Sequence, residues 1–223
     1  MSIVVTKTIN APTFSSRQLL GEKVVSYPES DGKLMGETAF HIKLIINLFQ
    51  TLETYFLSKT DVCIIADMMF YYQEDNPQKC ISPDVMVVKG VGNYLRRVFK
   101  LWEENVPEVI FEISSRKTWQ DDLQKKYTLY ENLGVKEYYV FDPEYDYLPE
   151  PFLAYHLKGN AFKQIKVKKG RVFSPSLNLE IVDTGKTLRL YNLETENFLP
   201  TMEELQTEVR KLKAELAKLK EQN

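Results

Sequence analysis

The segment Val109-Ile110-Phe111-Glu112-Ile113-Ser114 decides how this chain is organised, because it places an acid inside an apolar run. Short runs of large, mostly β-branched residues are typical of strands buried on both faces of a mixed or parallel sheet. An unpaired ionised carboxylate in such a strand costs several kcal/mol or is driven neutral. Glu112 therefore points to a function, because it is unfavourable for stability.

A second acid stands in a similar place. The segment Ser82-Pro83-Asp84-Val85-Met86-Val87-Val88 is an apolar strand that Asp84 opens after a proline. Asp84 could simply cap the turn after Pro83, because aspartate is common in turns. Two acids on neighbouring buried strands nevertheless predict a shared cation.

A helix is predicted to begin at Glu37, because large apolar residues recur at spacings of three and four through Phe56. At about 100° per residue, Glu37 and His41 fall on or beside the apolar face and point towards the sheet. Two simpler interpretations stay open. Glu37 could complement the positive end of its helix, and His41 could be a satisfied core histidine.

The segment Trp119–Leu133 is predicted to be a helix, with Thr118 as its N-cap and Gly134 at its end. Lys126 falls on the apolar face of this helix, Asp122 lies at its edge, and Lys125 points away. A lone lysine there would be expected to extend its ammonium to water. With two buried acids close by, we expect Lys126 to pair with them.

The order helix, strand, strand, strand, helix, strand predicts an α/β core with a mixed central sheet flanked by helices. Later alternating segments predict a peripheral antiparallel sheet, formed by Phe152–Leu157, Phe162–Val167, Val172–Phe173 and Leu188–Tyr191. We divide the chain into an N-terminal arm (1–26), the α/β domain (27–198) and a C-terminal coiled-coil helix (199–223).

The C-terminal segment carries a seam of apolar residues that alternate three and four apart: Met202, Leu205, Val209, Leu212, Leu216 and Leu219. With Met202 at position a, Glu208 and Glu215 fall at g, and Lys213 and Lys220 fall at e. A parallel pair sets these opposite charges together, so we predict a parallel homodimer through the Met202–Leu219 seam. A single helix folded back on the domain remains the alternative, because three heptads are marginal alone.

The amino-acid composition limits the classes of protein to which this chain can belong. The 223 residues include 29 Lys+Arg and 31 Asp+Glu, for a formal charge of −2, which counts mildly against a nucleic-acid binder. Two cysteines are too few for a disulfide framework or a zinc site. The N-terminal segment has no signal-peptide pattern, and no apolar stretch reaches membrane-spanning length, so we expect a cytoplasmic protein with no membrane partner.

The pair Pro83-Asp84 followed by Glu112-Ile113-Ser114 resembles the PD-(D/E)XK nuclease signature, except that Ser114 stands where lysine is usual. The longer pattern is similar to the Uma-type family of restriction-endonuclease-like proteins, over roughly Tyr27 to Asn192. The stretches that carry this resemblance are Tyr27-Pro28-Glu29-Ser30-Asp31-Gly32, Gly36-Glu37-Thr38 with His41, Ser82-Pro83-Asp84-Val85, Glu112-Ile113-Ser114-Ser115, Asp122-Leu123 with Lys126 and Tyr130, Gly134-Val135-Lys136-Glu137-Tyr138, and Phe141-Asp142-Pro143.

The resemblance implies a restriction-endonuclease-like fold and a DNA endonuclease that uses Mg²⁺ or Mn²⁺. It implies that Asp84, Glu112 and the backbone carbonyl of Ile113 hold the metal ion. It also implies that Lys126 replaces the strand lysine and that Glu37 supplies an extra acid. Asp122 would position Lys126 by an i,i+4 contact. The candidates for phosphate contacts are Arg96, Arg97, Lys100, Arg116 and Lys117, although such a cluster can equally be a solvated face.

Two other functions stay open. The chain could be a catalytically inactive nuclease fold, kept for DNA binding or protein interaction and dimerised by its tail. The acidic balance and Ser114 favour that interpretation, whereas the intact acid pair and the inward-facing Lys126 favour the enzyme. A phosphodiesterase acting on RNA or on a nucleotide is the third candidate.

Overall fold

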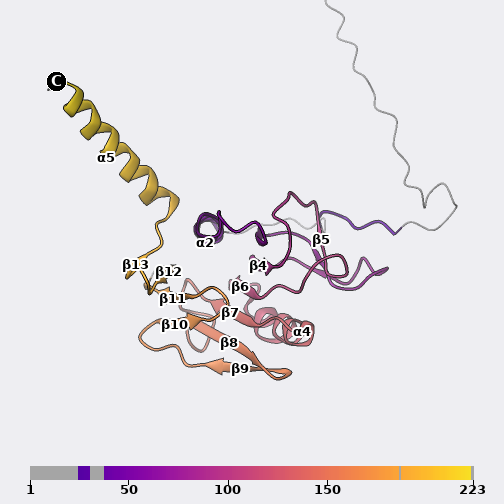
Figure 1. The fold of residues 1–223 in the computed structure, drawn as a ribbon. Helices are drawn as coiled ribbons and strands as arrows, with labels where there is room; N and C mark the ends of the chain where they lie inside the picture. Colours follow the sequence, from indigo (N-terminus) through magenta and orange to yellow (C-terminus); the bar gives the residue numbers. More distant parts are fainter. Residues whose placement is uncertain (1–24, 31–37, 186, 222–223) are drawn as a thin grey trace, which may run out of the picture.

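The computed structural model describes residues 25–30, 38–185 and 187–221 (Figure 1). Most of the expected N-terminal arm, residues 1–26, lies outside this part of the chain. Glu37, one of the predicted site residues, lies outside it as well.

A mixed six-stranded sheet forms the centre of the domain, as the sequence predicts. Its strands follow the order β1-β4-β6-β7-β8-β9. β6 and β7 run parallel, and the other neighbouring pairs are antiparallel. The bounds are β1 Val62–Ala66, β4 Val85–Lys89, β6 Val109–Ile113, β7 Glu137–Phe141, β8 Phe152–Lys158 and β9 Ala161–Ile165.

Two smaller sheets flank the central sheet. An antiparallel sheet is built from β10 (Arg171–Ser174), β11 (Leu179–Asp183), β12 (Leu188–Asn192) and β13 (Asn197–Phe198). A three-stranded sheet is built from β2 (Phe70–Tyr71), β3 (Cys80–Ile81) and β5 (Phe99–Lys100). The helical segments are α2 (Ala39–Tyr55), α3 (Trp119–Asp121), the π-helical turn η1 (Asp122–Lys126), α4 (Tyr127–Leu133) and α5 (Met202–Glu221).

The peripheral sheet differs from the prediction. Phe152–Leu157 and Phe162–Val167 were expected in it, but β8 pairs with β7, and the β8–β9 hairpin extends the central sheet. The separate antiparallel sheet begins at β10 and includes β11, which the sequence did not reveal. Alternation along a strand identifies its buried face, but it does not specify which sheet a hairpin joins.

The predicted helix Trp119–Leu133 also differs in detail. A π-helical turn interrupts it at Asp122–Lys126, and Thr118 makes no side-chain bond to the helix start. Instead, the Thr118 hydroxyl accepts a hydrogen bond from the backbone N–H of Ser115 at 3.0 Å. Gly134 ends α4 with φ 83°, the left-handed conformation predicted for a glycine C-cap.

The C-terminal helix α5 projects away from the domain (Figure 1). Thr201 and Glu204 form a capping box, in which each backbone N–H donates to the other side chain. Five of the six seam residues are exposed, by 38% to 58%, whereas Leu205 is half-buried; the five are Met202, Val209, Leu212, Leu216 and Leu219. The seam therefore does not fold back on its own domain. No helix in the described ranges is long and apolar enough to cross a membrane.

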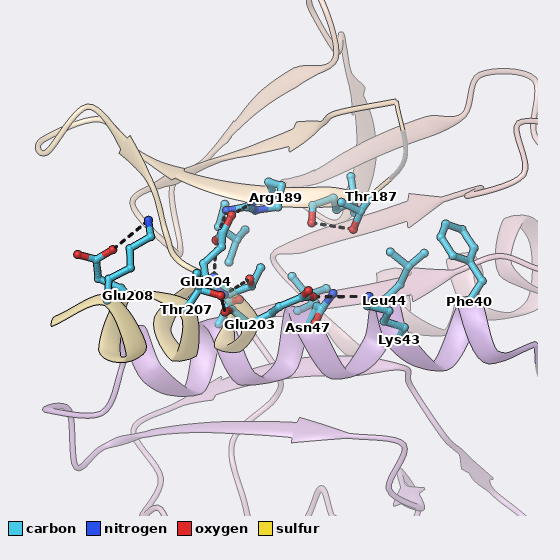
Figure 2. A pocket seen from close by; sticks show the side chains of 16 residues that line it. Phe40, Lys43, Leu44, Asn47, Thr187, Arg189, Glu203, Glu204, Thr207 and Glu208 are labelled. Atoms are coloured by element: carbon cyan, nitrogen blue, oxygen red, sulfur yellow. Dashed lines mark hydrogen bonds and ion pairs between the residues drawn. The ribbon is translucent and has the colours of Figure 1, made fainter. Parts of the chain in front are cut away.

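Polar residues connect the base of α5 to the domain (Figure 2). The Arg189 guanidinium in β12 donates to Oε2 of Glu204 at 2.9 Å, and Lys43 in α2 lies 3.7 Å from Glu203. Between α2, β12 and α5 lies a cleft of about 680 Å³, which Thr207 also lines. Because the polar face of α5 contacts the domain, its apolar seam points elsewhere.

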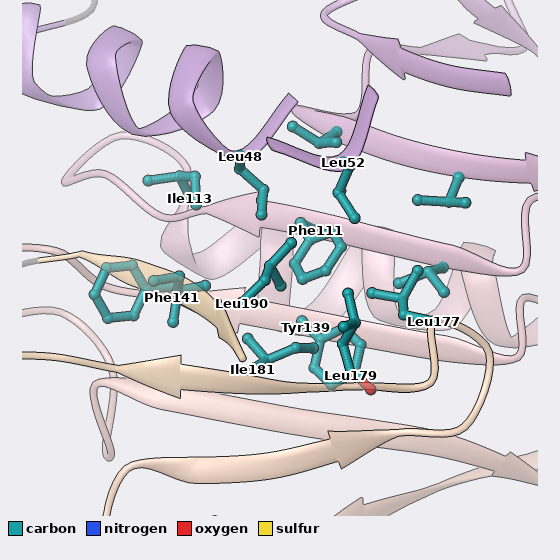
Figure 3. Close-up of a cluster of buried hydrophobic side chains, with 14 of the residues drawn as sticks. Leu48, Leu52, Phe111, Ile113, Tyr139, Phe141, Leu177, Leu179, Ile181 and Leu190 are labelled. Atoms are coloured by element: carbon teal, nitrogen blue, oxygen red, sulfur yellow. The ribbon is translucent and has the colours of Figure 1, made fainter. Parts of the chain in front are cut away.

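The largest part of the core lies between α2, the central sheet and the antiparallel sheet (Figure 3). Leu48 and Leu52 descend from α2 onto Phe111 of β6, and Ile181 and Leu190 come from the other sheet. A second cluster on the opposite face of the central sheet packs η1, α4 and the three-stranded sheet. β6 is thus covered on both faces, and all five of its residues are buried.

The acid at the end of β7 has a structural role. Asp142 is fully buried, and its carboxylate accepts five backbone hydrogen bonds, from the N–H groups of Glu144, Tyr145, Asp146, Tyr147 and Leu148. This set of bonds fixes the loop that leaves the sheet beside the end of β6.

We predict that Asp142→Ala lowers the free energy of unfolding by about 3 kcal/mol or more, because buried N–H donors lose their acceptor. Urea denaturation of the full chain measures this loss. The matched control is Asp146→Ala in the same loop, an exposed aspartate that should change stability by no more than about 0.5 kcal/mol. Equal effects of the two substitutions would contradict the assignment.

Candidate active site

The ends of β4 and β6 bring the two predicted acids together. Val85 pairs with Phe111, so continuing this antiparallel register sets Asp84 opposite Glu112, on one face of the sheet. Oδ2 of Asp84 accepts a hydrogen bond of 2.6 Å from the backbone N–H of Ile113. Asp84 is partly exposed, whereas Glu112 is 1% exposed. One acid thus reaches towards solvent, and the other lies inside the sheet.

Both oxygens of the Glu112 carboxylate are held by the next helical segment. Lys126 donates to Oε2 at 2.7 Å, and the Tyr130 hydroxyl donates to Oε1 at 2.7 Å. Burial raises the pKa of Glu112, and the charges of Asp84 and Asp122 raise it further. The ammonium of Lys126 lowers this pKa and favours the carboxylate form of Glu112.

Lys126 points inward, as its place on the helix predicts. Its side chain is 15% exposed, and its ammonium lies 2.9 Å from Oδ1 of Asp122 as well as 2.7 Å from Glu112. Burial lowers the pKa of Lys126, but the surrounding carboxylates outweigh burial, so the pKa lies above its usual value. The neighbouring Lys125 is 77% exposed and pairs with Asp121 at the surface.

Asp122 is a buried member of the same cluster, at 1% exposure. The Ser114 hydroxyl donates to its Oδ2 at 2.8 Å, and the Tyr138 hydroxyl donates to its backbone oxygen at 2.9 Å. Its backbone lies in the π-helical turn, and such turns are frequent at functional sites. Sequence reasoning assigned no role to Ser114 or Tyr130. In the sequence, Ser114 marks only the position of a missing lysine, and Tyr130 is only one residue of the stretches that carry the resemblance.

The first turn of α2 lies beside this cluster. The Thr38 side chain caps the helix by accepting from the backbone N–H of His41 at 3.2 Å. His41 is buried, and its Nε2 lies 3.8 Å from Oδ2 of Asp84. The histidine that was predicted to face the sheet therefore approaches the carboxylate at the end of β4.

The charge balance of the cluster fits a divalent cation. The carboxylates of Glu112 and Asp122 contact the ammonium of Lys126, and the charge of Asp84 acts on it as well. Each carboxylate oxygen of Glu112 has one hydrogen-bond donor, which leaves a lone pair on each. Within the described ranges, no three His, Cys, Asp or Glu side chains are grouped to ligate a metal ion. The carboxylate oxygens of Asp84 and Glu112 are nevertheless of the ligand type that hard divalent cations take in proteins.

The candidate phosphate contacts fall into different environments. The Arg96 side chain is 3% exposed and pairs with Glu104 at 2.6 Å, which argues against a phosphate contact. Arg97 is exposed but pairs with Glu29, and Lys100 pairs with Glu103 at 3.0 Å. The remaining pair, Arg116 and Lys117, lies exposed in the loop that directly follows β6. This pair lies nearest in sequence to the acid cluster.

Known proteins are similar to this chain in sequence and in structure. The chain matches the Uma2 family, described as "Putative restriction endonuclease", over residues 18–191. A solved structure described as "a putative nuclease belonging to DUF820 from Anabaena variabilis ATCC 29413" is similar, with 12% sequence identity and a TM-score of 0.47. The similarity covers 67% of this chain and 81% of that chain. No curated protein matches the chain.

The family match spans well over half of the chain and confirms the resemblance seen in the motifs. It includes both strands that carry the acid pair and the helical segment that carries Lys126. The protein belongs to the Uma2 family of restriction-endonuclease-like proteins.

Proposed function

We propose that this protein is a metal-dependent endonuclease that hydrolyses phosphodiester bonds in DNA, with Mg²⁺ or Mn²⁺ held by Asp84 and Glu112. The observation that carries the proposal is the buried Glu112–Lys126 pair beside Asp84, at the end of a sheet strand. A pair that served stability alone could be replaced by apolar residues at little cost. The backbone carbonyl of Ile113 is the proposed third protein ligand.

Each residue of the cluster has a distinct part in this mechanism. A bound cation supplies the Lewis acid that polarises the phosphate and lowers the pKa of an attacking water. Because the pKa of Lys126 is raised, its amine stays protonated at neutral pH and cannot act as a base. Lys126 therefore orients the water or neutralises charge that develops on the phosphate. Glu37 is proposed as a further acid of the site.

The substrate contacts follow from the exposed basic residues. Arg116 and Lys117 extend from the loop after β6 and are proposed to bind phosphate groups next to the scissile bond. Arg97 and Lys100 are proposed as more distant contacts, and both would have to exchange a carboxylate partner for a phosphate. Arg96 instead holds the 92–104 segment in place through Glu104.

The protein is proposed to work as a homodimer through the Met202–Leu219 seam. The seam is exposed, while the opposite face of α5 carries the ion pairs to Lys43 and Arg189. An exposed apolar face on a projecting helix of this length is typical of a coiled-coil partner surface. The charges at e and g fit a parallel pair, so the second copy of the chain is the natural partner. Two domains would then act on the two DNA strands.

We predict that the purified protein nicks supercoiled plasmid with Mn²⁺ or Mg²⁺ and that Glu112→Gln or Lys126→Ala lowers the rate at least about 100-fold. Glu112→Gln removes a metal ligand, and Lys126→Ala removes the positive charge near the phosphate. Gel assays over time measure both rates.

The matched control for this experiment is Lys125→Ala, because Lys125 is the adjacent lysine and lies in solvent. It should retain at least about a third of the wild-type rate. If Lys126→Ala cleaves as fast as Lys125→Ala, the role assigned to Lys126 is wrong, while the role assigned to the acid pair is not affected. If the wild type cleaves neither DNA nor RNA and binds no Mn²⁺, the inactive interaction module is the correct function.

We predict that the full chain is a dimer in sedimentation equilibrium and that Leu212→Asp makes it monomeric, because the substitution places a charge in the seam. Ala214→Asp adds the same charge outside the seam and should leave the dimer intact. Reversing Glu208 and Glu215 to lysine should weaken a parallel dimer, and adding Lys213→Glu and Lys220→Glu should restore it. A wild type that stays monomeric at tens of micromolar would exclude the proposed assembly.

A further inference from the structure

The most informative atom of the site is Oδ1 of Asp122. This oxygen is buried, and it accepts no hydrogen bond from any residue in the described ranges. The Lys126 ammonium lies only 2.9 Å away, but it is directed at Glu112, so the contact is an ion pair without hydrogen-bond geometry. This buried oxygen is therefore compensated by the charge of Lys126 alone, and its environment depends on where that ammonium lies.

Several hydrogen bonds fix the position of Asp122. Ser114 fixes its other oxygen, Tyr138 fixes its backbone oxygen, and the π-helical turn sets the direction of its side chain. Its Oδ1 lies 2.9 Å from the ammonium of Lys126. Ser114 directly follows β6, and its bond to Asp122 links the end of this strand to the acid that contacts Lys126.

Lys126 and a metal ion would compete for the same carboxylate. The ammonium now lies against Oε2 of Glu112, one of the oxygens that a cation would take. Two positive charges at one buried carboxylate repel each other strongly at low dielectric. Glu112 therefore serves the cation well only if Lys126 moves away, and the acceptor already within 2.9 Å is Oδ1 of Asp122.

We propose that Asp122, oriented by Ser114, is the positioning residue that receives the Lys126 ammonium when a divalent cation binds Glu112. In the metal-free protein, Lys126 bridges the two acids. In the loaded protein, Lys126 pairs with Asp122, and its remaining N–H donors face the substrate. The inference rests on the proposed metal-dependent function. It extends the positioning role expected of Asp122 to an exchange driven by the metal ion, and it adds Ser114, which acts through Asp122 and Lys126.

The test is Mn²⁺ binding, measured by isothermal titration calorimetry on the full chain without nucleic acid. Lys126→Met removes the competing ammonium and should tighten binding at least about tenfold. Asp122→Asn removes the second acceptor and should weaken binding by about 10- to 100-fold, the usual effect of residues that orient a metal ligand. Ser114→Ala leaves every charge in place and should weaken binding in the same direction by a smaller factor.

A double substitution separates positioning from simple charge. In the Lys126→Met background there is no ammonium to receive, so Asp122→Asn should change the Mn²⁺ dissociation constant less than about threefold. If Asp122 acts only through its own charge, the full tenfold loss persists in that background and the proposal is overturned. Tighter binding is also required of Lys126→Met itself, and weaker binding there would equally overturn it.

The second buried carboxylate cluster supplies the matched control. Ser174 is fully buried and donates to Glu137, as Ser114 donates to Asp122, but Glu137 lies in a separate network with Tyr139 and His156. Ser174→Ala should lower stability without changing Mn²⁺ affinity. Lys126→Gln serves as the second variant where Lys126→Met fails to fold, as judged by circular dichroism.

The outcomes also separate this inference from the proposed function. A wild type that binds no Mn²⁺ removes the function and the inference together. A wild type that binds Mn²⁺ with unchanged affinity in all the variants removes the inference alone. Metal binding with the predicted shifts, but without cleavage of any nucleic acid, keeps the inference and removes the nuclease.

Discussion

The ion pair between Glu112 and Lys126 is the constraint on which the rest of this structure depends. Removing one partner of a buried pair leaves an uncompensated charge that costs about 3–5 kcal/mol. Lys126 must therefore come from a segment that crosses the end of β6, and η1 and α4 satisfy that requirement. Tyr130 follows one turn later and holds the other oxygen of Glu112. The placement of this helical segment on the sheet is thus tied to the acid beneath it.

Among the described residues, the buried acids of the candidate site have different hydrogen-bond partners from the buried acids with a structural role. Asp142 is satisfied by backbone N–H groups, and Glu137 by hydroxyls and a backbone N–H. Both carboxylates are therefore stabilised by fixed dipoles and have no basic side chain among their hydrogen-bond donors. Glu112 and Asp122 instead share one lysine, beside a third acid that reaches solvent. Such an arrangement is unfavourable for stability but suits a cation.

The sequence was sufficient to predict the parts of the fold that depend on local pattern. The double-sided burial of β6, the inward face of the helix carrying Lys126, and the C-terminal helix all follow from periodicity. The sheet that β8 and β9 join could not be predicted, because pairing partners are set by long-range packing. The sequence also could not predict the π-helical turn or the hydrogen bonds that Ser114 and Tyr130 make. A serine or tyrosine next to an acid in space has no signature in the linear chain.

The chain has more acidic than basic residues, and this balance affects how such an enzyme would bind DNA. With a net charge of −2, and with Arg96 engaged in an internal ion pair, one domain offers few phosphate contacts. Affinity from so few contacts is low and falls steeply with salt. Two domains joined through α5 would make the second binding event intramolecular, which raises avidity without any new contact. A tail that projects away from the domain and exposes most of its apolar seam to solvent is well placed for that task.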